Sequence, residues 1–494
     1  MIMNKKSLEG YKIIFGYLGI FLIFTGVINL IPLLMLIFFP EEYTQAWHFL
    51  IPGIGSIGLG LLLYQFIKGK TNITTLKNQD AIIVTISWIL CMFISAIPYT
   101  FEYSFSQSVF ETTSALSTTG FSILNLESLS KILTFHRVIL SFVGGIGVML
   151  IMLVFLRDKR GMRLYSSEGH NDKLLPNLIN SSKAILKIYC GYIIGGIILY
   201  IILGMNWFDS ICHSVNAVAT SGFSNKVGSI GYYDNIGIEI VTIILMLLGS
   251  INFLVQFLLI KGKWKNFFKY CETKAMTVIY AIFIPIIAFL LFKTADLSLS
   301  QSFRSAAFHT ISAMTSTGFS IMNTNIPALS GSIILLLIIL MLIGGGASST
   351  SGGIKVYRIH LMIKDFFWNI KDKFISKNVV SLHFVQKAEE TVAVDNEERD
   401  SVKFFILLYL FVAIVLTLLL SLYGYDVLSC LFDVISSMGN IGFSMGIFNP
   451  LSPNGVLWIS TIAMLLGRLE IIVVMMAIVQ IGKKIKDTIQ YKKN

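Results

Sequence analysis

Long apolar stretches alternate with short polar ones along the whole chain. A helix needs about 20 predominantly apolar residues to cross the hydrocarbon core of a bilayer. Ten stretches have this length, and they cover about residues 13–39, 48–67, 80–98, 133–156, 184–204, 237–260, 275–293, 331–363, 403–422 and 456–482. The eighth is interrupted by a glycine- and serine-rich run. The first is too long for the core of a signal peptide and has no cleavage pattern, so we count it as a span. The pattern predicts an all-α polytopic membrane protein.

Charged residues are scarce and unevenly placed. They make up 13% of the chain, about half of the share in soluble proteins. The formal net charge is +11, but 32 of the 38 Lys and Arg lie in six short segments: residues 1–12, 68–78, 157–187, 261–274, 355–403 and 483–494. Basic residues beside spans mark the cytoplasmic side, so we expect a multi-pass protein of the cytoplasmic (inner) cell membrane with both termini in the cytoplasm. The charge therefore indicates topology and no nucleic acid partner. A soluble multidomain enzyme and a disordered chain are excluded.

Four shorter apolar stretches remain, each on the outer side between two spans. They cover about residues 103–118, 207–220, 301–316 and 427–440. They are too short to cross a bilayer, but their length suits a re-entrant half-helix. Each ends in a Gly-Phe-Ser motif, at Gly120-Phe121-Ser122, Gly222-Phe223-Ser224, Gly318-Phe319-Ser320 and Gly442-Phe443-Ser444. Composition alone gives about three Gly-Phe pairs for 39 Gly and 37 Phe in 494 residues, so the serine after all four makes the pattern significant.

The residues before each motif also correspond. Nine positions before the glycine stand Glu111, His213, His309 and Asp433, and six positions before it stand Ser114, Asn216, Ser312 and Ser436. Successive glycines are 102, 96 and 124 residues apart, which is one loop and two spans each time. We therefore predict four parallel span–re-entrant loop–span repeats around one pore, after two extra N-terminal spans. The predicted units are residues 1–74 (extra spans), 75–163, 164–270, 271–375 (with a broken second helix) and 376–494.

Irregular backbone at membrane depth is tolerated only where it lines a water-filled cavity or is buried in protein. Four such loops around one axis would present backbone carbonyls that replace the hydration shell of a cation. The candidate ligands are Thr118, Thr119, Gly120, Thr220, Ser221, Gly222, Ser316, Thr317, Gly318, Asn440, Ile441 and Gly442. The four phenylalanines would support the loops from behind. In the fourth loop Asn440 and Ile441 replace residues with hydroxyl side chains. Coordination by backbone carbonyls remains possible after this change, because it does not use the side chains. The alternative is that small residues serve only helix packing.

A second candidate element interrupts the eighth span. Its five glycines and three serines within residues 344–353 cannot sustain a helix, so the segment should line a cavity beneath the loops. Arg468, midway along the last predicted span, is costly in a membrane and defaults to a functional role, with Glu470 or the loop carbonyls as partner. We interpret the segment and the arginine as a gate; the alternative is an arginine that only ties helices together. The gate residues are Gly345, Gly346, Ala347, Ser348, Ser349, Thr350, Ser351, Gly352 and Arg468.

Together these motifs resemble the Trk/Ktr/HKT superfamily of potassium transporters over about residues 75–482. Residues 144–147 (Gly-Gly-Ile-Gly) resemble its glycine-rich stretch after the first loop, and residues 344–355 resemble its intramembrane loop. The two extra spans favour the TrkH branch, and glycine in all four loops matches the potassium-selective pattern. The resemblance implies K⁺ as the transported and bound ion, an arginine that opposes cation passage when the pore is closed, a homodimer, and a cytoplasmic nucleotide-binding regulatory subunit of TrkA type.

Other polar residues are open to two interpretations. Glu111 and Asp433 either supply negative potential or cap the half-helices; His213 and His309 either pack or couple transport to protons. Arg137 is interpreted as an interfacial anchor. The polar stretch 371–402 is expected to be a solvated cytoplasmic loop. The basic segments 157–163, 261–274 and 355–373 suit either a partner or membrane lipid headgroups.

No enzyme is expected. The five cysteines have no paired spacing, and the chain has no nucleotide-binding loop, metal-ligand spacing or nucleophile triad. A membrane-embedded enzyme would need clusters of titratable residues inside spans. A secondary transporter for another cation or a small solute is the remaining alternative, although it would favour inverted repeats over parallel ones.

Overall fold

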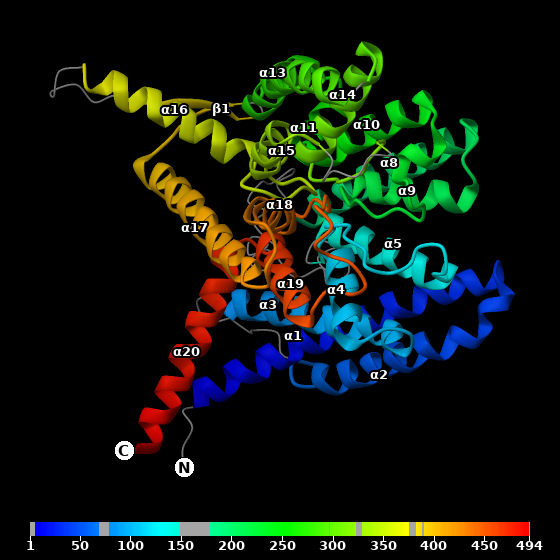
Figure 1. The fold of residues 1–494 in the computed structure, drawn as a ribbon. Coiled ribbons are helices and arrows are strands. Elements are labelled where there is room, and N and C mark those ends of the chain that lie inside the picture. The colour runs from blue at the N-terminus through cyan, green and yellow to red at the C-terminus, as the bar shows by residue number, and fades with distance from the viewer. Residues whose placement is uncertain are drawn as a thin grey trace.

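The computed structural model describes residues 5–68, 79–148, 178–295, 297–322, 329–374, 382–387 and 390–493. Six of its helices are long and apolar enough to cross a membrane: Lys12–Ile37, Pro40–Tyr64, Gln79–Phe101, Asn180–Ile202, Cys271–Thr294 and Asn396–Ser421. Two more predicted spans are pairs of helices joined at a sharp bend. The helices form one bundle, and α16, β1 and α17 project from one side of it (Figure 1). The predicted all-α polytopic membrane fold is confirmed.

The first two helices form a hairpin. α1 (Lys5–Leu30) and α2 (Ala46–Tyr64) are joined by the 3-10 helices η1 (Ile31–Ile37) and η2 (Pro40–Gln45). A methyl carbon added at Gly19 would lie 2.7 Å from the carbonyl oxygen of Gly60, and one added at Gly60 would lie 2.6 Å from that of Gly19. Such close backbone approach through small residues is typical of helices in membranes. α1 also packs against α3 and so attaches the hairpin to the rest of the bundle.

The same order of elements then occurs four times: a long helix, a short helix, an extended loop and a second helix. The four sets are α3 (Gln79–Ala96), α4 (Phe105–Leu116) and α5 (Lys131–Ile146); α8 (Leu178–Ile202), α9 (Trp207–Val218) and α10 (Ile236–Ser250); α13 (Cys271–Thr294), α14 (Leu299–Met314) and α15 (Gly331–Ile343); and α17 (Asn396–Ser421), α18 (Val427–Met438) and α19 (Asn454–Arg468). The 3-10 helix η3 (Ile97–Phe101) extends α3, and η4 (Ser229–Tyr233) precedes α10.

The four short helices begin and end alike. Each begins at an N-cap side chain that accepts a backbone N–H bond from the first turn: Ser104, Asn206, Ser298 and Asp426. These caps satisfy N–H groups that a helix leaves unpaired. Shortly after each helix, one residue adopts a left-handed backbone conformation with φ of 52° to 59°: Thr118, Thr220, Ser316 and Asn440. The chain therefore turns sharply at the same place in all four sets and enters the Gly-Phe-Ser loop.

All four second helices end abruptly, whereas the sequence predicted only one interruption. α10 and α11 (Phe253–Ile260) meet at 114°, and α19 and α20 (Ile471–Lys493) meet at 103°. The prediction of unbroken spans at 237–260 and 456–482 is therefore wrong. At the first bend the Asn252 side chain accepts a 2.8 Å bond from the N–H of Leu254 and starts a new helix; at the second, Glu470 has φ of 57°. α5 ends at Ile146, before Gly147 with φ of 93°; part of the predicted span 133–156 lies outside the described residues.

The predicted solvated loop at 371–402 contains more structure than expected. β1 (Phe384–Lys387) and β2 (Glu390–Ala393) form an antiparallel hairpin. It lies between α16 (Val356–Asp372) and the start of α17, and Val385 is buried there. His383 stacks on Trp368 of α16 with ring centroids 4.6 Å apart. α12 (Trp264–Lys269) lies between α11 and α13 along the chain.

Candidate functional site

The four Gly-Phe-Ser loops converge on one point of the molecule. A methyl carbon added at Gly222 would lie 2.8 Å from the carbonyl oxygen of Thr317 and 3.2 Å from that of Ile441. One added at Gly120 would collide with the backbone of Gly222, one at Gly318 with the carbonyl of Ile441, and one at Gly442 with the carbonyl of Thr119. Each loop thus touches the next, and the fourth touches the first, so the loops form a closed ring. We call this the glycine ring (residues 118–120, 220–222, 316–318 and 440–442).

Glycine is needed in the ring for two reasons. Gly120, Gly318 and Gly442 have φ of 90°, 83° and 95°, which L side chains rarely adopt. Gly222 does not share this conformation, and there the close approach of neighbouring backbone excludes a side chain. Steric crowding therefore explains the glycine at all four positions, and the expected backbone angle adds to it at Gly120, Gly318 and Gly442.

Recurrent backbone bonds hold the loops. In every set the N–H before the glycine donates to the carbonyl oxygen five residues earlier: Thr119 to Ser114 at 2.8 Å, Ser221 to Asn216 at 2.8 Å, Thr317 to Ser312 at 3.0 Å and Ile441 to Ser436 at 2.9 Å. The phenylalanines after the glycines are buried, as expected for side chains behind the loops: Phe121, Phe223, Phe319 and Phe443. The loops are thus fixed by the protein's own contacts.

Buried oxygen atoms without a hydrogen-bond partner lie at the start of three loops. Within the described residues these are Thr118 Oγ1, Ser316 Oγ and Asn440 Oδ1. They occupy equivalent positions, two residues before the glycine. In the second loop the equivalent Thr220 Oγ1 lies 3.1 Å from Thr350 Oγ1 of the 344–353 segment. A buried oxygen without a partner is costly unless a ligand or water satisfies it. The C-terminal ends of the four short helices, which carry partial negative charge, lead to these same positions.

The segment between α15 and α16, residues 344–355, is a buried loop against the short-helix ends. Its neck is closed by backbone bonds, among them Lys355 N to Ile343 O at 2.9 Å. The Thr350 hydroxyl bonds to the carbonyl oxygens of Gly249 at 2.9 Å and Val218 at 3.2 Å. A methyl carbon added at Gly352 would collide with the Gly439 carbonyl. The loop therefore packs against the C-terminal ends of α9 and α18, directly beside the glycine ring. We call it the intramembrane loop.

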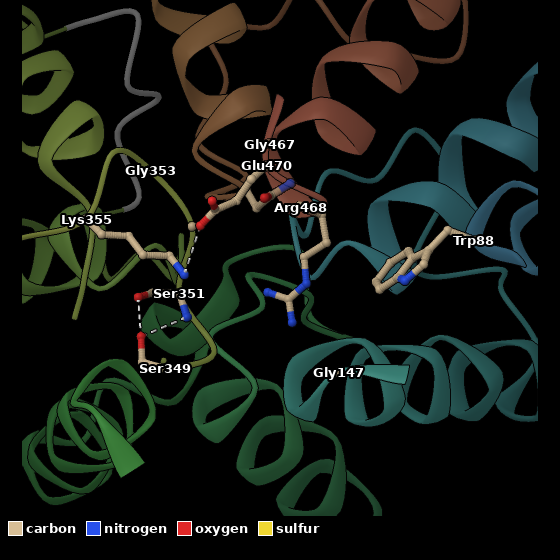
Figure 2. A pocket seen from close by; sticks show the side chains of 11 residues that line it. Trp88, Gly147, Ser349, Ser351, Gly353, Lys355, Gly467, Arg468 and Glu470 are labelled. Carbon is tan, nitrogen blue, oxygen red and sulfur yellow. Dashed lines mark hydrogen bonds and ion pairs between the residues drawn. The ribbon is translucent and has the colours of Figure 1, made fainter. Parts of the chain in front are cut away.

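Arg468 joins three parts of the site. Its guanidinium donates to the carbonyl oxygen of Thr350 at 2.7 Å, to that of Gly145 at 3.0 Å and to that of Gly144. Figure 2 shows the guanidinium turned away from the Glu470 carboxylate. Of the two partners expected for Arg468, the loop carbonyls are the ones found. The arginine also ends α19 instead of lying midway along an unbroken helix.

Glu470 belongs to a different charge network, which the sequence did not suggest. It accepts a 2.8 Å bond from Arg358 of α16, and Lys355 lies 3.8 Å away. On the neighbouring side the N–H of Ala347, within the intramembrane loop, lies 3.1 Å from the Glu272 carboxylate at the start of α13. These groups, together with Lys387 and Glu398, line a cavity of about 280 Å³. In the sequence, the only indication that Glu272 has a role was its position as an acidic residue in the first turn of a membrane-spanning helix.

Arg137 is not an interfacial anchor, because it is only 1% exposed. Its Nη1 lies 2.8 Å from Glu111 Oε1, which is also buried. The guanidinium lies 4.9 Å from the ring centroid of Phe223 in the next loop. The sequence shows both charged residues, but it does not show that two residues 26 positions apart, on different helices, form an ion pair. Glu111 does not cap its own helix; its other bonds reach the loop after the glycine ring.

The chain matches the family model described as TrkH, cation transport protein, over residues 56–484. It is 31% identical over 481 residues to the uncharacterized cation transporter MJ1485 of Methanocaldococcus jannaschii, covering 96% of both chains. It is 26% identical to the Trk system potassium uptake protein TrkH of Halomonas elongata, covering 94% of this chain and 97% of that one.

The structure also resembles a solved one. The crystal structure of the potassium transporter TrkH from Vibrio parahaemolyticus matches with a TM-score of 0.80 and 25% identity, covering 94% of this chain and 98% of that one. The family match extends through the glycine ring, the intramembrane loop and Arg468. The chain therefore belongs to the TrkH family of cation transport proteins.

Proposed function

We propose that this chain carries potassium ions into the cell through the glycine ring. The observation that carries the proposal is the ring itself, where four backbone segments meet so closely that a side chain at the glycine would collide. Carbonyl oxygens arranged in this way replace the hydration shell of a cation. The relatives from Halomonas elongata and Vibrio parahaemolyticus are named as potassium transporters. The ligands would be Thr118, Thr119, Gly120, Thr220, Ser221, Gly222, Ser316, Thr317, Gly318, Asn440, Ile441 and Gly442.

The unpartnered oxygens of Thr118, Ser316 and Asn440 support a further ion or water position beside the ring. Carbonyl coordination remains possible in the fourth loop, where the amide of the Asn440 side chain adds a buried oxygen without a hydrogen-bond partner. The proposed pore units are residues 75–163, 164–270, 271–375 and 376–494, with residues 1–74 packed outside them.

We propose that the intramembrane loop and Arg468 form the gate. The gate residues would be Gly345, Gly346, Ala347, Ser348, Ser349, Thr350, Ser351, Gly352 and Arg468. A positive charge beside the ring raises the energy of a cation there. The bonds from Arg468 to Thr350 and to the α5 carbonyls favour the closed arrangement. Opening then requires the loop to leave the short-helix ends.

The family membership supports a wider assembly. We propose a homodimer in the cytoplasmic (inner) membrane, surrounded by lipid, with a cytoplasmic nucleotide-binding subunit of TrkA type. The start of α1 and the end of α20 point to the same side of the molecule in Figure 1, which agrees with both termini in the cytoplasm. α16, the β-hairpin and the cavity beside the intramembrane loop would face that partner.

Growth rescue and ion flux test the proposal together. The chain is expressed in bacteria that lack potassium uptake, and purified protein is reconstituted into vesicles for uptake of K⁺, Rb⁺ and Na⁺. Rescue at low external potassium, with K⁺ preferred over Na⁺, is expected. Gly120→Ser and Gly318→Ser should reduce that preference. Uptake of Na⁺ equal to that of K⁺, or no rescue by protein that reaches the membrane, would contradict potassium selectivity.

A further inference from the structure

One side chain in each of the four sets connects a short helix to the loop beyond the glycine ring. The bonds join a residue nine positions before the glycine to the serine two positions after it. Ser122 Oγ donates to Glu111 Oε1 at 2.8 Å, and Ser444 Oγ donates to Asp433 Oδ2 at 2.8 Å. His213 Nε2 lies 2.9 Å from Ser224 Oγ, and His309 Nε2 lies 3.0 Å from Ser320 Oγ. Two carboxylates and two imidazoles thus occupy one structural position.

The hydrogen-bond directions in the two histidine sets follow from their other partners. His213 Nδ1 lies 2.8 Å from the carbonyl oxygen of Asp209, which can only accept, so Nδ1 carries the proton. Ser224 Oγ accepts the N–H of Lys226 at 2.9 Å, which leaves its own proton free. The serine can therefore donate to Nε2 of a neutral imidazole.

His309 repeats this arrangement. Its Nδ1 lies 2.8 Å from the carbonyl oxygen of Ser305, and Ser320 Oγ accepts the N–H of Met322 at 3.2 Å. In the carboxylate sets the serine likewise accepts an N–H two residues on, from Leu124 at 3.4 Å and Gly446 at 2.9 Å. A neutral histidine with its proton on Nδ1 is thus an acceptor in the same place as a carboxylate.

The same histidines also contact the next loop of the ring. The His213 ring centroid lies 5.9 Å from that of Phe319, and the His309 centroid lies 6.2 Å from that of Phe443. In the first set this contact is made by Arg137, the partner of Glu111, over Phe223. All four loops are therefore bonded to their own short helix, and the second, third and fourth are also packed against the set before them.

We propose that His213 and His309 are positioning residues of the glycine ring, each fixing its own loop through a serine hydroxyl and the next loop through its imidazole ring. This rests on the proposed function, in which the geometry of the ring decides between ions. The histidines need neither carry protons nor contact the ion in this role. They supply an uncharged acceptor where the other two sets use a carboxylate.

The test compares His213→Ala, Ser224→Ala, the double variant and His213→Gln, whose amide oxygen restores an acceptor. We expect Ser224→Ala to reduce the K⁺/Na⁺ uptake ratio about fivefold, the effect of one hydrogen bond of about 1 kcal/mol. His213→Ala should reduce it more, because it also removes the ring beside Phe319, and the double variant should match His213→Ala, because both single changes remove the same bond between the two side chains. His213→Gln, which restores the acceptor but not the ring, should bring the ratio nearer to the wild-type value than His213→Ala. His136→Ala, which removes an equally buried imidazole that contacts Phe49 and Tyr99, should leave the ratio unchanged.

A second measurement does not depend on transport. Hydrogen exchange of residues 221–226 should increase in His213→Ala and in Ser224→Ala, with no further increase in the double variant. Exchange at 317–322 should increase in His213→Ala and in the double variant but not in Ser224→Ala, because only the loss of His213 removes the ring beside Phe319. Additive effects, or unchanged exchange at both loops, would overturn the inference even if the chain transports another ion. Failure of wild-type potassium uptake with the expected exchange pattern would instead contradict the proposed function alone.

Discussion

Arg468 Nη1 donates a 2.7 Å hydrogen bond to the carbonyl oxygen of Thr350, across 118 residues of sequence. The bond joins the end of α19 to the intramembrane loop. Nη2 of the same guanidinium donates to the carbonyl oxygens of Gly144 and Gly145 at the end of α5. One charged side chain thus holds the intramembrane loop against the first and last sets of pore helices. If the loop must move for ions to pass, this bond is broken in the open state.

Removing the guanidinium should favour the open state. A hydrogen bond to a charged group contributes about 1.5–3 kcal/mol, so Arg468→Ala should raise potassium flux roughly tenfold to a hundredfold under conditions that keep the wild type closed. Arg468→Lys, which keeps the charge but cannot reach both groups of carbonyls, should give an intermediate flux. Flux is measured in reconstituted vesicles. Lys261→Ala, at an exposed residue far along the chain from the loop, is the control; equal flux in Arg468→Ala and wild type would contradict the gate.

The glycine ring is best tested against a glycine with the same backbone angle but free space around it. Gly318 has φ of 83° and Gly424 has φ of 89°. A methyl group at Gly318 would collide with the Ile441 carbonyl, whereas nothing lies within 4 Å of one at Gly424. Both alanine variants carry about 1 kcal/mol of backbone strain. Only Gly318→Ala should lower the K⁺/Na⁺ ratio in vesicle uptake. A similar loss in Gly424→Ala would show that strain, not ring geometry, is responsible.

The repeated parts of this molecule were predictable from sequence because they leave local signals. The Gly-Phe-Ser motifs and the residues nine positions earlier marked four equivalent loops. Hydrophobic length alone could not show that α10 and α19 stop early, since Ser250-Ile251-Asn252 and Gly467-Arg468-Leu469-Glu470 are brief polar breaks within long apolar runs. Pairings such as Glu111 with Arg137 depend on helix packing between distant segments. Its residue type does not distinguish a buried arginine from one at the membrane interface.

That buried pair gives the third prediction. Glu111 is fully buried and bonds to Arg137 at 2.8 Å, to Ser122 at 2.8 Å and to the N–H of Ile123 at 3.2 Å. Glu111→Ala leaves the guanidinium buried without its counter-charge, which typically costs about 3–5 kcal/mol. We expect a large fall in thermal stability in detergent. The double variant Glu111→Gln/Arg137→Met, which removes both charges at similar volume, should recover much of it. A Glu111→Ala protein as stable as the wild type would contradict this assignment.

The contact between α16 and α17 should depend on acid in a defined direction. Asp365 of α16 bonds to Lys403 of α17 at 2.8 Å and to Arg399. Burial opposes ionisation of Asp365, but the bonds from Lys403 and Arg399 outweigh it, so its pKa lies below the ordinary value of 3.8. Because the pKa of Asp365 is lower in the folded state, its ion pairs stabilise the contact at pH values above the ordinary pKa of 3.8. This stabilisation is lost as the pH falls through the lower folded-state pKa.

At neutral pH, Asp365→Asn should lower stability by about 1–2 kcal/mol, since the pair is partly exposed. Hydrogen exchange of residues 361–372 measures the effect. The difference between variant and wild type should shrink as the pH falls below 3.8 and disappear once the pH is below the lowered folded-state pKa of Asp365. A difference that persists after Asp365 is protonated would exclude ionised Asp365 as its cause.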